Sequence, residues 1–124
     1  MLSVFAALAQ LALEEFGAHS GGIVAHVAYV GGTPSDPNKL RIILPDGSYL
    51  DVWLSVDGDY AYHWEQRRQR GRIFRWDNAP HHPHIGTFPD HFHSGQEDEV
   101  IESHLSSAPA DALRQVLVFI DQHL

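Results

Sequence analysis

The chain has 124 residues, of which 44% are hydrophobic and 19% charged, and these values are typical of one globular domain and argue against a disordered chain. It contains no cysteine, which excludes disulfides and thiolate metal sites and favours a cytoplasmic protein. The net charge of −8 argues against nucleic-acid binding by the whole surface. Ten histidines could raise that charge to +2 in mild acid, so the surface should respond strongly to pH.

The first predicted element is a helix over residues 2–16. Its apolar side chains recur at helical spacing, as Phe5, Leu8, Ala12 and Phe16. The segment lacks a positive leader and includes two glutamates, and no run in the chain approaches the roughly 18 apolar residues of a membrane helix. We therefore expect neither a signal peptide nor a membrane segment. The β-rich run GIVAHVAYV (22–30) could add a strand, and residues 31–38 predict a loop.

The middle of the chain predicts an antiparallel meander. Four β-like runs, KLRIIL, SYLDVWLSV, DYAYHWE and RIFRWD, are separated by PDG, DG and RRQRG, which are typical of hairpin turns. A register with Tyr62 facing Trp76 and Val56 facing Tyr60 places one apolar face toward the core: Val52, Leu54, Val56, Tyr60, Tyr62, Trp64, Phe74 and Trp76. His63 then faces Arg75 on the opposite, polar face.

The C-terminal element is predicted to be a second helix. It begins near Pro109, a residue favoured in a first helical turn, and continues to the C-terminus. Its apolar stripe consists of Leu113, Val116, Leu117 and Ile120. The expected fold is therefore a single α+β domain over residues 1–124, with an N-terminal helix, an antiparallel meander of about four to five strands, a histidine-rich loop and a C-terminal helix.

The stretch DNAPHHPHIGTFPDHFH (77–93) contains five histidines, and its three prolines fix its shape. The last predicted strand places Arg75, opposite His63, at one end of the sheet, and the stretch begins there. We expect a shared site there, with the catalytic candidates His63, Arg75, Asp77, His81, His91 and His93. One histidine would take a proton from an RNA 2′-hydroxyl, a second would protonate the leaving oxygen, and an arginine would stabilise the phosphorane-like state. Alternatively, His63 and Arg75 only fill a solvated sheet face.

Four further residues are candidates for substrate binding: Trp53, Arg67, Arg68 and Asn78. Trp53 could stack on a base, or it could pack under a loop or at a dimer contact, which makes a homodimer a second expectation. Arg67 and Arg68 could steer RNA phosphates, although charged hairpin tips are usually solvated. Asn78 follows Asp77 and would share its pocket.

Metal binding is a second interpretation of the same stretch. The HxH spacing of His91 and His93 puts both imidazoles on the same side of an extended strand. With His81, or with His82, His84 or Asp90, three ligands for zinc or another divalent ion are available. In the acid–base interpretation no metal or other cofactor is needed.

Three segments carry a resemblance to a known family: YAYHWE (60–65), GRIFRWDNAPHHPHIGTFPDHFHSG (71–95) and VIESHLS (100–106). Together they resemble the TumE-type toxins of prokaryotic toxin–antitoxin systems over roughly residues 40–124. The resemblance implies a toxin-like protein with a cognate antitoxin, acting on RNA, and with the site above it implies a metal-independent ribonuclease. The alternative is a metal-binding or partner-binding module of the same fold without catalytic activity.

Overall fold

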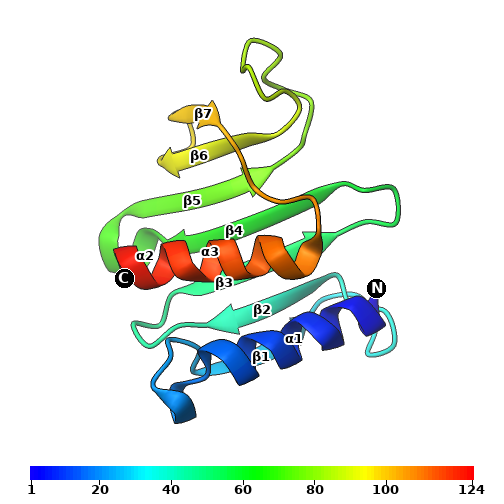
Figure 1. Cartoon of the computed structure of the whole chain (residues 1–124), viewed down its shortest axis with the longest axis vertical. Coiled ribbons are helices and arrows are strands. Elements are labelled where there is room, and N and C mark those ends of the chain that lie inside the picture. Colours follow the sequence, from blue (N-terminus) through cyan, green and yellow to red (C-terminus); the bar gives the residue numbers. More distant parts are fainter.

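The computed structural model describes all 124 residues and contains one seven-stranded antiparallel sheet. The strands follow one another across the sheet in chain order, as a continuous meander (Figure 1). They are β1 (His26–Val30), β2 (Lys39–Ile43), β3 (Tyr49–Leu54), β4 (Tyr60–Gln66), β5 (Arg72–Asp77), β6 (His91–Gly95) and β7 (Val100–Glu102). The predicted α+β class is confirmed, but the prediction of four to five strands is wrong.

Two strands were missed because their sequences carry a weak β signal. β6 is HFHSG, which lacks β-branched residues and follows Pro89, and β7 is three residues long. His91 and His93 therefore lie on a strand of the sheet, and the irregular part of the histidine-rich stretch is residues 78–90. The same-side placement predicted from their spacing is confirmed, since they pair with Asp77 and Arg75, which are themselves two residues apart.

Both long helices, α1 (Leu2–Phe16) and α3 (Pro109–His123), cover one face of the sheet (Figure 1). α1 contacts β1 and β2, and Phe119 of α3 packs edge-on against the rings of Trp64 and Phe74 in β4 and β5. The predicted stripes of both helices lie in the core, apart from Phe16, which is only partly buried. Two short helical segments, η1 (Ala18–Ser20) and α2 (Arg67–Arg70), join neighbouring elements. None of the helices has the length and apolar character needed to cross a membrane.

The pairing of β4 with β5 follows the predicted register, with Tyr62 opposite Trp76 and His63 opposite Arg75. The pairing of β3 with β4 differs from the prediction by two residues, since Leu54 and not Val56 faces Tyr60. The turn explains the difference. The Ser55 hydroxyl accepts hydrogen bonds from the backbone N–H groups of Asp57 and Asp59, and Gly58 takes the left-handed conformation at the end of a three-residue loop. Val56 lies in that loop and is 88% exposed, so its predicted core position is wrong.

A buried polar pair joins β4 to the loop before β3. Trp64 is fully buried, and its indole N–H donates to the Ser48 hydroxyl over 2.9 Å. Ser48 in turn donates to the carboxylate of Asp46, which also accepts from the amide of Gln66. Every polar atom at this end of the core therefore has a partner, as burial requires.

Replacing Ser48 with alanine should lower the free energy of unfolding by about 1–3 kcal/mol, because the Trp64 N–H would lose its acceptor inside the core. Urea denaturation of the purified variant measures the change. Ser3→Ala, on the exposed side of α1, is the matched control and should stay within about 0.5 kcal/mol of the parent. Equal stabilities for the two variants would contradict the assigned role of the Ser48 hydroxyl.

Candidate functional site

A pocket of about 550 Å³ lies on the polar face of the sheet, beside the start of the loop 78–90. Strands β3 to β6 form its floor, and the loop and the β6–β7 turn form its walls. It is lined by Trp53, Asp59, Tyr60, Ala61, Arg75, Asp77, Asn78, Ala79, Pro80, His81, His82, His91, His93 and Glu97. The face that the helices leave uncovered is therefore the one that carries the ionisable groups.

At the β5–β6 end of the floor, four side chains on two paired strands form a compact polar cluster, which we call the square: Arg75, Asp77, His91 and His93. Asp77 pairs with His91 and Arg75 pairs with His93, and all four point to the same face because they alternate along the strands. The Asp77 carboxylate lies 3.0 Å from Nε2 of His91 and 3.5 Å from Nε2 of His93. The side chains of both histidines are at most 5% exposed, so the square is fixed within the protein.

Arg75 connects this square to its surroundings through all five of its N–H groups. Nε donates to Asp77 over 3.0 Å, and the two Nη atoms donate to Glu97 over 2.8 and 2.6 Å. The remaining two donors meet Nδ1 of His63 and Nε2 of His93, each at 3.3 Å. The hydrogen bonds from Arg75 lower the pKa of the Glu97 carboxyl to about 2. The guanidinium therefore holds the floor together and has no donor left for a substrate.

The hydrogen bonds assign the protonation of the two strand histidines. Nδ1 of His91 donates to the carbonyl of Pro89 over 3.0 Å, and Nδ1 of His93 donates to the carbonyl of Glu97 over 2.8 Å. In each ring this leaves Nε2 as the nitrogen that faces the Asp77 carboxylate. For His93 the lone pair accepts from Arg75, but for His91 it faces another acceptor, Oδ1 of Asp77. That contact requires a positive charge between the two atoms, from a proton or from a metal ion.

The lining carries more negative than positive charge. One guanidinium, that of Arg75, stands among the three carboxylates of Asp59, Asp77 and Glu97. With neutral histidines, the lining therefore repels an anion such as a phosphate group. A protonated histidine or a bound cation would offset this negative charge and favour the entry of a phosphate.

Of the residues predicted for the site, Arg75, Asp77, His81, His91, His93, Trp53 and Asn78 line this pocket. His63 lies behind Arg75, in an adjacent hollow of about 330 Å³ that also contains Glu65. Its Nδ1 accepts from Arg75 and its Nε2–H donates to Glu65 over 3.1 Å, so its ring is neutral and held in place. Arg67 bonds to Glu65 and Glu97 outside the pocket.

The other predicted residues have distinct positions. Arg68 lies near Gly47, away from the pocket. Asn78 uses its amide within the fold, since its oxygen accepts from the Tyr60 backbone N–H and its nitrogen donates to the Gly58 carbonyl. Trp53 is 39% exposed and borders both hollows.

Two residues at the site, Glu97 and Tyr60, were not predicted to belong to it. Glu97 lies in the acidic run after β6, and the turn after Gly95 brings it back to Arg75. Tyr60 packs against the core, as predicted, and in addition its hydroxyl donates to Asp90 over 2.7 Å at the edge of the pocket. Among the loop histidines, His82 and not His81 packs against the strand pair, with ring centroids 4.6 Å from His91 and 5.7 Å from His93. The Ser94-Gly95 pair, a dipeptide typical of turns, was a sequence signal that could have indicated the turn after Gly95.

Comparison with known proteins gives one match. A family model described as "Toxin TumE" matches residues 18–124. No curated protein and no solved structure matches the chain. The matched range contains every strand of the sheet, the loop 78–90 and α3.

The neutral ring of His63 should make stability depend on pH. Burial lowers the pKa of His63 below its ordinary value of 6.5. The unfolded chain therefore takes up a proton that the folded chain resists, and the contribution of His63 to stability is lost as the pH falls below about 6.5. Relative to a His63→Gln variant, the parent should lose free energy of unfolding between about pH 7.5 and pH 5. Denaturant titrations across that range measure this.

A His26→Gln variant controls for the removal of one imidazole, because His26 is exposed on β1. The pH-dependent difference should be larger for the His63 variant than for this control. If the free energies of unfolding of the parent and of His63→Gln differed by the same amount at every pH, the assignment of a neutral ring to His63 would be contradicted.

Proposed function

The chain belongs to the TumE toxin family, and on that premise we propose that it acts as a toxin by cleaving the phosphodiester backbone of RNA in the pocket above Asp77. Membership in a toxin family implies a protein antitoxin as its partner. The observation that carries the proposal is the pocket itself. Five of the six residues expected to be catalytic converge there, from two strands and one loop, beside an exposed tryptophan.

The proposed reaction is attack by the 2′-hydroxyl on the adjacent phosphorus. The 2′-oxygen forms a bond to phosphorus, the bond from phosphorus to the 5′-oxygen breaks, and the products are a 2′,3′-cyclic phosphate and a free 5′-hydroxyl. The proton of the 2′-hydroxyl goes to a base of the protein, and the leaving 5′-oxygen takes a proton from water at the open mouth of the pocket.

His81 is the residue we assign as that base. Its side chain lines the pocket, is exposed and makes no hydrogen bond within the protein. His91 and His93 are less suited to exchange a proton with a substrate, because both nitrogens of each ring already have partners. Arg75 is a positioning residue that fixes the floor, and Trp53 offers a ring face on which a base can stack.

The purified protein should cleave single-stranded RNA and should leave the same sequence intact when a 2′-deoxynucleotide replaces the nucleotide at the cleaved position. His81→Ala should lower the rate by about 10²–10⁴, which is the usual contribution of one proton transfer. His104→Ala is the matched control, because His104 is also exposed but lies outside the pocket. Gel analysis of labelled RNA, with mapping of the product ends, measures both rate and chemistry.

Two results would reject this function. Equal rates for the His81 and His104 variants would remove the assigned base, and 5′-phosphate products would exclude attack by the 2′-hydroxyl. If no RNA is cleaved while expression of the protein still arrests growth, the toxin acts by binding a partner and not by cleaving RNA.

A further inference from the structure

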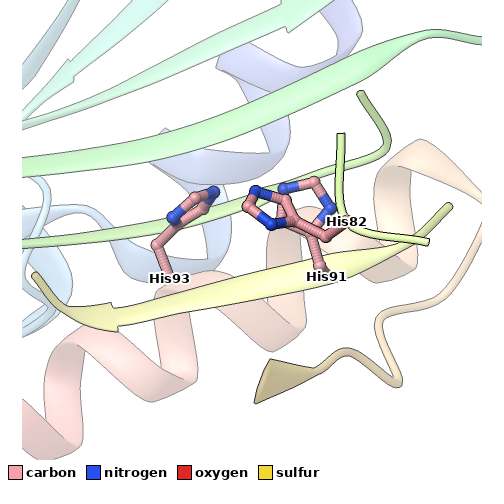
Figure 2. A group of neighbouring side chains, drawn as sticks. All are labelled: His82, His91 and His93. Atoms are coloured by element: carbon pink, nitrogen blue, oxygen red, sulfur yellow. The ribbon is translucent and has the colours of Figure 1, made fainter. Parts of the chain in front are cut away.

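We propose that His82, His91 and His93 bind one divalent transition-metal ion, of the zinc type, at the floor of the pocket. The three side chains come from the loop 78–90 and from β6, and Figure 2 shows their rings gathered over one side of that strand. The proposal goes beyond the activity on RNA, because an ion can be bound whether or not the pocket cleaves RNA.

The three donors already lie close together. One ring nitrogen of each histidine falls within 4.8 Å of the others. A tetrahedral zinc ion with bonds of about 2.0–2.1 Å holds its nitrogens roughly 3.4 Å apart, so the largest nitrogen–nitrogen distance in the cluster must shorten by at most roughly 1.4 Å. His82 can supply that movement, because it lies on the loop, is only partly buried and makes no side-chain hydrogen bond.

The two strand histidines are oriented as metal ligands usually are. A histidine that binds a metal commonly donates its other N–H to a backbone carbonyl or a carboxylate, which fixes the tautomer and aims the free lone pair. His91 does this with the carbonyl of Pro89, and His93 does it with the carbonyl of Glu97. Both Nε2 atoms are thereby turned toward the Asp77 carboxylate, where an ion would find neutral nitrogen donors beside a negative charge.

The charge of the site also favours a cation. Nε2 of His91 and Oδ1 of Asp77 are 3.0 Å apart, and both carry lone pairs when Nδ1 of His91 holds the ring proton. A bound ion satisfies both atoms at once. It also offsets the three carboxylates of the lining and so favours the entry of a phosphate.

Arg75 is the group that opposes the ion, since its Nη2 lies 3.3 Å from Nε2 of His93. This long hydrogen bond can be exchanged when a metal takes the lone pair, because the same Nη2 already donates to Glu97 over 2.6 Å. Three imidazoles select zinc, copper, nickel or iron over magnesium and calcium, which prefer oxygen ligands.

The test uses the full chain after treatment with a chelator and removal of the chelator. Titration calorimetry with Zn²⁺ should give one site per chain, the melting temperature should rise with Zn²⁺, and Mg²⁺ should do neither. Co²⁺ in place of Zn²⁺ should give the visible absorption of a tetrahedral site. His82→Ala should weaken Zn²⁺ binding at least about tenfold and leave the melting temperature of the metal-free protein unchanged.

His84→Ala is the matched control, because His84 lies on the same loop two residues away and is exposed, but it does not belong to the cluster. It should bind Zn²⁺ as the parent does. The proposal would be overturned if the parent protein lacked a Zn²⁺ site, or if His82→Ala and His84→Ala weakened Zn²⁺ binding equally. If the protein binds no Zn²⁺ but still cleaves RNA after treatment with the chelator, the metal site is overturned and the proposed RNA cleavage stands. If it binds Zn²⁺ but cleaves no RNA, the metal site is supported and only the proposed RNA cleavage is rejected.

Discussion

The alternation of side chains along seven antiparallel strands is the constraint on which the rest of the molecule depends. Successive residues of each strand point to opposite faces, so one face collects the apolar side chains that α1 and α3 cover, and the other collects the ionisable ones. A shift of one residue in any pairing would bury the charged set under the helices and expose the core set. The positions of the pocket and of the hydrophobic core are therefore fixed by the same pattern.

The polar face tolerates buried charge because Arg75 donates to most of the nearby acceptors, with Nε2 of His91 as the exception. Asp77, His91 and His93 are each less than 8% exposed, and an unpaired charge at such depth would cost several kcal/mol. The five hydrogen bonds of the guanidinium satisfy two carboxylates and two imidazoles at once. This role explains why an arginine stands there, since its planar fork reaches several partners in one plane and a lysine could not.

The site combines a fixed floor with an adjustable wall. The strands hold Asp77, His91 and His93 through backbone pairing, whereas His81 and His82 stand on the loop 78–90 without side-chain hydrogen bonds. A fixed floor suits groups that must be aimed, and free histidines suit groups that must meet a ligand. The negative charge of the lining links the proposed metal site to the proposed cleavage of RNA. A metal ion bound at the floor would offset that charge and so favour the binding of an RNA phosphate.

Local pattern was sufficient to predict both helices, the pairing of β4 with β5 and the common side of His91 and His93. These features follow from periodicity within one segment or across one short turn. The register of β3 against β4 was not determined in this way, because a shift of two residues keeps every side chain on its own face and only the turn at Gly58 distinguishes the two pairings. The tertiary structure likewise decided that Glu97 returns to Arg75, that His63 stands behind it, and that His82 and not His81 joins the strand histidines. Such contacts depend on how loops and neighbouring strands meet in space, which the spacing of residues along one strand does not specify.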